Sequence, residues 1–195
     1  NLKNMKYQIL TYPTKSLLEK SKEVTTNDEL RELSIHIVRM IHTLLNSQGI
    51  GLASPQVGKN IRVIVLSSGN EKYKDESFVS EKINAINSAE NSTDLKNIID
   101  DIDYLINPII IKKSDEKISI NEGCLSVPNI VSKKIKRSNS VLVIFKNIKH
   151  ETQTKTFNDV GSVCIQHEID HLDGKLFFME LNTINRRKLM KSYKN

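Results

Sequence analysis

The sequence predicts an α+β fold in which antiparallel sheets pack around a central helix. Three observations support this prediction. Apolar side chains recur at helical spacing over residues 28–47 and again over residues 160–172. Six short stretches rich in β-branched residues lie between these two segments, separated by turn-forming residues. Because the stretches are short and close in sequence, they can pair as antiparallel neighbours within one α+β domain.

The N-terminal third is predicted to contain an arm, a helix and a strand. Residues 9–18 mix apolar residues with a Pro, as in an arm that packs a few anchors onto the domain. Asn27 and Asp28 supply a cap for a helix over residues 28–47. Residues 62–66 have the β-branched content and the length of a buried strand.

Residues 67–103 differ from the rest of the chain. They are rich in Asn, Ser, Lys, Asp and Glu, and their first part has few apolar residues. Such a composition buries little apolar surface. We therefore predict that this segment is an insertion that forms a long loop.

Regular structure is predicted to resume after residue 103. Strands are expected at residues 105–106, 109–111, 117–120, 141–145 and 152–157. A helix over residues 160–172 follows, and Gly174 supplies its stop signal. A last helix is predicted over residues 181–193. The 195 residues fit one domain that spans residues 1–195.

Composition argues against several classes of function. The formal net charge is +6, but the 29 Lys and Arg are scattered among 23 Asp and Glu. A nucleic-acid surface needs clustered cations with interleaved aromatics, and aromatic residues make up only 5% of the chain, so DNA is not an expected partner. No apolar run approaches the roughly 18 residues of a membrane span, so no membrane association is expected. Cys124 and Cys164 lack a secretory context, so no disulfide is expected.

The predicted helix over residues 160–172 carries the clearest chemical signal. His167 and His171 are four residues apart, so in a helix their β-carbons lie about 5–6 Å apart on one face and both rings can bind one metal ion. Glu168 projects beside them and can hold a water molecule. Asp170 is either a carboxylate that orients a ligand or a solvated helix residue. The central helix is therefore predicted to bind metal, and the protein to be a metal-dependent hydrolase.

A catalytic metal site of this kind takes three protein ligands, so one more donor is needed. Cys124 is the best candidate, because Gly123 lets the backbone turn just before a thiolate donor. The alternative is that Cys124 is a small buried apolar side chain. Glu180 is a second candidate ligand, but the HExxHxxGxxH pattern is absent. An HExxH metallopeptidase and a metal-binding protein without catalysis both stay open.

A third segment, residues 49–58, is rich in glycine. It is not a phosphate loop, because it follows a predicted helix and lacks the Gly-Lys-Ser/Thr ending. Gly49 and Gly51 are better explained by a backbone that runs close to an extended substrate. Gln56 would then supply an amide near the metal.

Taken together, these three segments resemble those of the peptide deformylases. The family's motifs, with φ for an apolar residue, are GφGφAAxQ, EGCLS and QHEφDH. They appear in this order at residues 49–56, 122–126 and 166–171. The second and third match residue for residue, whereas the first has Ser54 in place of a second Ala. Residues 129–136 also depart from many bacterial members: they lack a Gly and an aromatic residue, and the segment is one residue longer before Arg137.

The resemblance implies a role for each matched residue. Glu168 would be the general base and acid, and Gln56 with the backbone N–H of Leu125 would form the oxyanion hole. The ion would be Fe²⁺ natively, with Zn²⁺, Co²⁺ or Ni²⁺ as substitutes. Its ligands would be Cys124, His167 and His171.

The implied reaction removes the formyl group from N-formyl-methionyl nascent peptides and releases formate. An apolar slot would take the Met side chain, and the peptide would pair with a strand edge. Ordinary core packing explains most of the apolar residues of this slot equally well. The residues matched to the family's substrate site are Gly49, Ile50, Gly51, Ile120, Glu122, Gly123, Val160, Val163 and Cys164.

Two further expectations concern a contact with the ribosome and the cellular compartment of the protein. The basic run over residues 186–194 predicts a ribosome contact through the C-terminal helix, which bacterial relatives use in this way. The alternative is a solvated helix end, where cations are favoured. The Asn-, Lys- and Ile-rich composition, the insertion and a first residue other than Met predict a processed enzyme of a eukaryotic organelle, a plastid such as the apicoplast, with a bacterial cytoplasm as the alternative.

Overall fold

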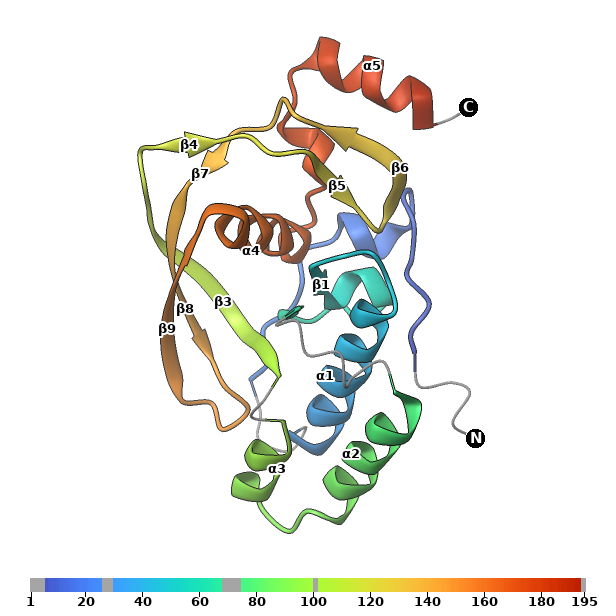
Figure 1. Cartoon of the computed structure of the whole chain (residues 1–195), viewed down its shortest axis with the longest axis vertical. Coiled ribbons are helices and arrows are strands. Elements are labelled where there is room, and N and C mark those ends of the chain that lie inside the picture. Colours follow the sequence, from blue (N-terminus) through green and yellow to red (C-terminus); the bar gives the residue numbers. More distant parts are fainter. Residues whose placement is uncertain (1–5, 26–29, 68–74, 100–101, 194–195) are drawn as a thin grey trace.

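The computed structural model describes residues 6–25, 30–67, 75–99 and 102–193. Its largest sheet has five antiparallel strands in the order β1-β2-β3-β8-β9 (Figure 1). These strands are β1 (Gly51–Ala53), β2 (Val63–Leu66), β3 (Asp103–Lys113), β8 (Ser140–Lys146) and β9 (Thr152–Asn158). The strands predicted in residues 62–66, 141–145 and 152–157 are therefore confirmed, whereas the two stretches predicted at residues 105–106 and 109–111 form one continuous strand, β3.

Two small sheets lie on the other side of the central helix (Figure 1). β4 (Lys117–Ile118) pairs with β7 (Arg137–Ser138), and β5 (Glu122–Cys124) pairs with β6 (Val127–Ser132). The predicted strand over residues 117–120 is wrong beyond Ile118. The sequence shows no signal for the other three strands, because they are short and lack a regular alternation of apolar and polar residues.

The central helix is α4 (Asp159–Leu172), which lies between the five-stranded sheet and the two small sheets (Figure 1). Every side chain from Ser162 to Ile169 is buried. Polar groups in such a helix need partners inside the protein, and the Gln166 amide donates to the carbonyl of Ser138 in β7 at 2.9 Å. This arrangement confirms the predicted α+β fold with antiparallel sheets around a central helix.

The first long helix, α1 (Leu30–Leu45), packs against β1 and β2. It confirms the predicted helix from Leu30 to Leu45 and ends two residues before the predicted end, and the predicted cap at Asn27 and Asp28 lies outside the described residues. Its fully buried apolar side chains are Ile37, Val38, Met40, Ile41 and Leu44. This face forms the centre of the largest apolar cluster.

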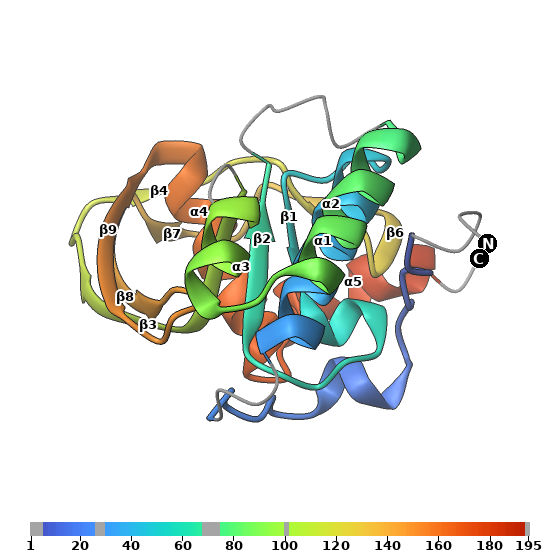
Figure 2. The ribbon, with the colours of Figure 1, turned by 90° about the horizontal axis from the view of Figure 1, so that it is seen from below.

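The prediction of a long loop over residues 67–103 is wrong for most of the segment. Residues Glu76–Ser88 form α2 and residues Ser92–Ile99 form α3, and both helices pack on α1 (Figure 2). Each helix needs only a narrow apolar stripe to dock there, and a mostly polar composition hides that stripe. The buried apolar residues of the two helices are Val79, Ile86, Leu95 and Ile99.

The N-terminal arm, residues 6–18, binds two of the three motif segments through its backbone. The N–H of Leu10 donates to the carbonyl of Gln56 at 2.8 Å, and the N–H of Tyr12 donates to the carbonyl of Ser126 at 2.8 Å. The arm therefore joins the glycine-rich segment to the loop after Cys124. This agrees with the prediction of an arm with a few anchors.

The last helix, α5 (Thr183–Tyr193), begins two residues later than predicted. The preceding residues form a 3₁₀ turn, η6 (Phe177–Glu180), whose end includes Leu181. α5 packs on β6, and the hydroxyl of Tyr193 donates to the carbonyl of Tyr12 at 2.7 Å. Within the described part of the chain, no helix combines the length and the apolar character that crossing a membrane requires.

Candidate metal centre and active site

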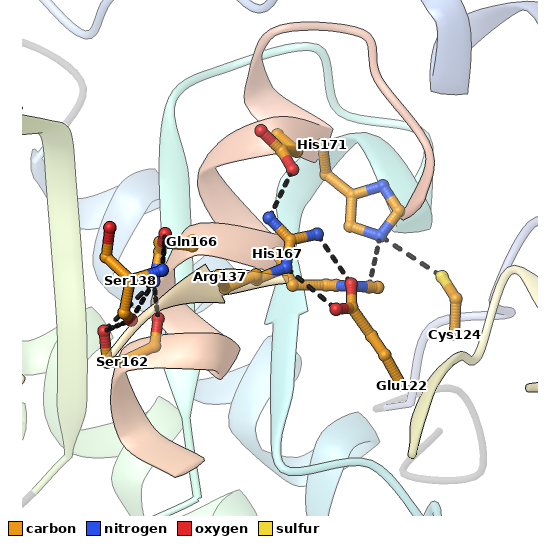
Figure 3. A network of polar contacts seen from close by, with 9 residues as sticks. Glu122, Cys124, Arg137, Ser138, Ser162, Gln166, His167 and His171 are labelled. Carbon is orange, nitrogen blue, oxygen red and sulfur yellow. Dashed lines mark hydrogen bonds and ion pairs between the residues drawn. The ribbon is translucent and has the colours of Figure 1, made fainter. Parts of the chain in front are cut away.

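Cys124 of β5 and two histidines of α4 come together between the small sheets and the central helix (Figure 3). The Sγ of Cys124 lies 3.2 Å from Nε2 of His171, and that nitrogen lies 3.2 Å from Nε2 of His167. All three donor atoms lie within 4.8 Å of one another. In the described part of the chain, no other His, Cys, Asp or Glu group meets this criterion.

This donor set fits a divalent transition metal. Donors that bind one such ion tetrahedrally at about 2.0–2.3 Å are themselves about 3.3–3.6 Å apart, close to the two separations of 3.2 Å in the cluster. One thiolate with two imidazoles suits iron, cobalt, nickel or zinc. Cys124 and His167 also line a cavity, so an ion held here would be accessible to a ligand.

An ion-pair network orients His167 (Figure 3). Its Nδ1 lies 2.7 Å from Oε1 of Glu122, and the Glu122 carboxylate accepts two hydrogen bonds from Arg137, at 2.8 Å and 2.6 Å. Burial raises the pKa of Glu122, but the hydrogen bonds from Arg137 and His167 outweigh it and bring the pKa to about 2. The ionised Glu122 therefore accepts the Nδ1 proton, which leaves the Nε2 lone pair of His167 free to face the cluster.

The same network assigns roles that the sequence did not predict. Arg137 carries no motif signal, because it lies 15 residues from Glu122 and 33 from Asp170 and only the pairing of β7 brings the three together. Asp170 accepts from Nη1 of Arg137 at 2.7 Å. Asp170 is therefore neither a direct partner of a ligand nor a solvated residue: it contacts the histidine only through Arg137 and Glu122.

Glu168 is buried beside the glycine-rich segment. A β-carbon at Gly51 would lie 2.6 Å from Oε1 of Glu168 and 2.8 Å from Sγ of Cys164, so this close approach requires glycine. Among the described residues, Oε2 of Glu168 has no hydrogen-bond partner. Burial raises the pKa of Glu168 to about 7. A carboxyl group with such a pKa can both accept and return a proton near neutral pH.

Gln56 is fixed beside Cys124 by its own turn, η4 (Ser54–Val57). Its Oε1 accepts from the N–H of Ala53 at 2.8 Å. Its Nε2 donates to the Ser126 hydroxyl at 3.1 Å and lies 3.7 Å from Sγ of Cys124. Because the N–H of Ala53 occupies the oxygen and Ser126 accepts one amide N–H, the other amide N–H faces Cys124 of the metal cluster, as an oxyanion donor requires.

Ser54, the departure from the first motif, makes a contact that Ala could not make. Its hydroxyl lies 2.7 Å from Nε2 of His36, whose Nδ1 lies 2.8 Å from the hydroxyl of Tyr7. Burial, aided by the charges of Lys59 and Arg39, lowers the pKa of His36 to about 3. The neutral imidazole thus connects η4 to α1 and to the N-terminal arm.

A cavity of about 540 Å³ opens beside the metal cluster. It is also lined by Gln56, Leu125 and Glu168. Val160 is not among its lining residues, because it lies in the first turn of α4, half exposed. The other residues matched to a substrate site all line it: Gly49, Ile50, Gly51, Ile120, Glu122, Gly123, Val163 and Cys164.

The three motif segments therefore meet at one cavity, and comparison with known proteins identifies the family. The sequence matches the family described as Polypeptide deformylase over residues 6–187. The chain belongs to this family. It is a metal-dependent hydrolase that removes the N-formyl group from nascent peptides. Because the match covers all three motifs, the HExxH metallopeptidase and the non-catalytic alternatives are set aside.

Related deformylases align with nearly the whole of this chain. The peptide deformylase of Hydrogenovibrio crunogenus is 35% identical over 192 residues, which are 97% of this chain and 94% of that protein. A solved plant peptide deformylase is 27% identical with a TM-score of 0.75, covering 96% of this chain and 87% of that one. A solved deformylase from Plasmodium falciparum is 28% identical with a TM-score of 0.68, covering 96% and 97%. The predicted family, fold and reaction are thereby confirmed.

Proposed function

We propose that Cys124, His167 and His171 hold one divalent metal ion. The observation that supports this most strongly is the cluster of three donor atoms beside the cavity that Cys124, His167 and Glu168 line, where the buried Oε2 of Glu168 has no hydrogen-bond partner among the described residues. When bound, the ion would act as a Lewis acid that polarises the formyl carbonyl and lowers the pKa of water. We propose Fe²⁺ as the native ion, with Zn²⁺, Co²⁺ and Ni²⁺ as substitutes, because the thiolate and imidazole donors accept all four.

The protein's own groups would then move the proton and stabilise the developing charge. Glu168 would take a proton from the attacking water and return it to the amide nitrogen as the formamide C–N bond breaks. Formate would leave, and the peptide would keep a free amino group. Nε2 of Gln56 and the backbone N–H of Leu125 would donate to the oxygen on which negative charge develops.

The substrate Met would occupy the 540 Å³ cavity between β1 and α4. Val163 and Cys164 of α4 and Ile50 before β1 would contact its side chain. β1 is an edge strand of the five-stranded sheet. Its outer edge, at Gly51, would therefore be available to pair with the extended backbone of the peptide.

One comparison of substrates tests this proposal. Anaerobically purified enzyme with measured metal content is incubated with formyl-Met-Ala and, separately, with Met-Ala. We expect formate from the first peptide and no free Met from the second. Chelation should abolish formate release, and Fe²⁺, Co²⁺ or Ni²⁺ should restore it better than Zn²⁺. Cleavage of Met-Ala without formate release would instead indicate a metallopeptidase.

We also propose that α5 contacts the ribosome. This helix carries four cations and no acidic residue over residues 183–193, and such a cluster attracts RNA phosphates. We expect the Arg187→Gln/Lys191→Gln variant to sediment less with ribosomes at low salt than the parent enzyme. The exposed pair Lys112 and Lys113 of β3 provides a control variant of equal charge change. Equal sedimentation of both variants would refute the contact.

A plastid such as the apicoplast is the proposed compartment. The Asn- and Lys-rich composition and the likeness to solved deformylases from a plant and from Plasmodium falciparum support it. A bacterial cytoplasm is the alternative, because the deformylases of Hydrogenovibrio crunogenus and Wolbachia pipientis are 35% and 33% identical to this chain, against 27% and 28% for the plant and Plasmodium falciparum structures. Immunolocalisation with an antibody raised against this chain would decide between the two.

A further inference from the structure

A second cavity lies away from the metal cluster, between α5 and the end of β6. Its volume is about 520 Å³. α5 lies along this side of β6 at one end of the molecule (Figure 1). We call this second cavity the lysine groove. It is lined by Val131, Ser132, Lys133, Lys134, Leu181, Asn185, Lys188, Leu189 and Ser192.

The lysine groove is basic at its rim. Lys133, Lys134 and Lys188 are exposed, and Nζ of Lys134 donates to Oδ1 of Asn185 across the groove at 2.7 Å. No acidic residue is among the lining residues. The reason lies in the sequence, because residues 123–150 and residues 181–195 contain no Asp or Glu. Two acid-free segments thus face each other here, and an anionic ligand would meet no repulsion from the lining.

The groove also has apolar surface, and it shares the lining residue Val131 with the catalytic cavity. Val131 is 54% exposed, an unusual degree for a Val in a strand, and it lines both cavities. β6 begins at Val127, which pairs with the candidate metal ligand Cys124. A chain that leaves the catalytic cavity along β6 therefore passes over Val131 and reaches the lysines.

We propose that the lysine groove is a distal substrate subsite that binds acidic side chains of the formylated peptide, several residues after the formyl-Met. This inference rests on the proposed assignment of the catalytic cavity. Val131 and Leu189 would contact the peptide's apolar groups, and Lys133 and Lys188 would pair with its carboxylates. The shared wall at Val131 favours the substrate over RNA as the occupant, because a phosphate backbone would gain nothing from continuity with the catalytic cavity.

The test uses peptides of two lengths. Nonapeptides that begin formyl-Met-Ala-Ser continue with either three Glu or three Lys among otherwise identical residues, and formyl-Met-Ala-Ser itself is the short reference. We expect kcat/KM of the Glu peptide to exceed that of the Lys peptide about threefold to tenfold, as one or two exposed ion pairs allow. The difference should lie in KM rather than kcat and should fade in about 0.5 M NaCl.

Two matched double variants locate the effect. Lys133→Gln/Lys188→Gln should remove the preference for the Glu peptide, whereas Lys112→Gln/Lys113→Gln removes the same charge on β3 and should keep it. Equal kcat/KM for the two nonapeptides, or a preference that survives the groove variant, would overturn the proposal. The proposal would also be overturned if the parent showed no preference between the peptides and the groove variant lost binding to a single-stranded RNA oligonucleotide.

The tripeptide separates this proposal from the assignment of the active site. It is too short to reach the groove, so parent and groove variant should release formate from it at rates within about twofold. Turnover of the tripeptide without any preference among nonapeptides would refute the lysine groove alone. Failure of the parent to deformylate the tripeptide would overturn the catalytic assignment and the groove with it.

Discussion

Replacing Glu168 with Gln is expected to lower kcat for formyl-Met-Ala-Ser by about 10²- to 10⁴-fold, the range in which general acid–base catalysis contributes. Gln fills nearly the same volume beside Gly51, so the packing is kept. Its amide cannot accept a proton from water or return one to the leaving nitrogen. Metal content should stay unchanged, because Glu168 lies outside the cluster of three donors. A coupled assay for formate and metal analysis of the same samples check both statements.

Glu180 offers a matched control for this variant. It is an exposed carboxylate on η6, outside the cluster of donors, and it was the other candidate for the third ligand. We expect Glu180→Gln to retain both formate release and metal within about twofold. If Glu168→Gln released formate as fast as the parent, the proposed proton transfer would be wrong. If Glu180→Gln lost its metal, the assignment of Cys124 as a ligand would be wrong.

Replacing Arg137 with Gln is expected to weaken metal binding about 10- to 100-fold, although Arg137 touches no proposed ligand. Without its two hydrogen bonds, Glu122 becomes an uncompensated buried charge and holds His167 less firmly. Breaking a buried pair in this way costs about 3–5 kcal/mol of unfolding free energy. Titration with Co²⁺ in competition with a chelator measures the Kd, and urea unfolding measures the stability.

Arg62 separates loss of metal affinity from loss of stability. It is buried to the same degree as Arg137, at 8% against 7% exposed, and pairs with Asp173 at 2.8 Å without contacting a proposed ligand. We expect Arg62→Gln to lose stability while its Co²⁺ Kd stays within about twofold of the parent. Equal weakening of metal binding in both variants would mean that Arg137 acts only through stability.

The conservative variant Arg137→Lys sharpens the same prediction. Lysine keeps the charge but lacks the planar fork that reaches Glu122 with two nitrogens and Asp170 with the third. We expect its Kd to lie between those of the parent and of Arg137→Gln. A Kd equal to that of Arg137→Gln would show that geometry rather than charge positions Glu122.

Local patterns in the sequence predicted much of the fold. The helical spacing that predicted α1 and α4 and the β-branched runs that predicted β2, β3, β8 and β9 are properties of windows shorter than 20 residues. The helices α2 and α3 were not predicted because their apolar stripes are narrow and their composition is polar. The strands β5 to β7 were not predicted because they are short and lack a regular alternation of apolar and polar residues. β5 and β6 pair with each other as sequence neighbours, and β7 pairs with β4.

Residue types and their order along the chain are sufficient to identify the chemistry of this protein. His167, Glu168 and Cys124 lie in motifs whose residue types and order identify a metal-dependent deformylase. How these groups are held depends on tertiary contacts: Arg137 bridges Glu122 and Asp170, and the arm joins Gln56 to the loop after Cys124. Tertiary packing alone also brought β6 beside α5 to form the lysine groove. The physical reason is that these contacts join residues far apart in sequence, and packing of the whole chain selects such neighbours.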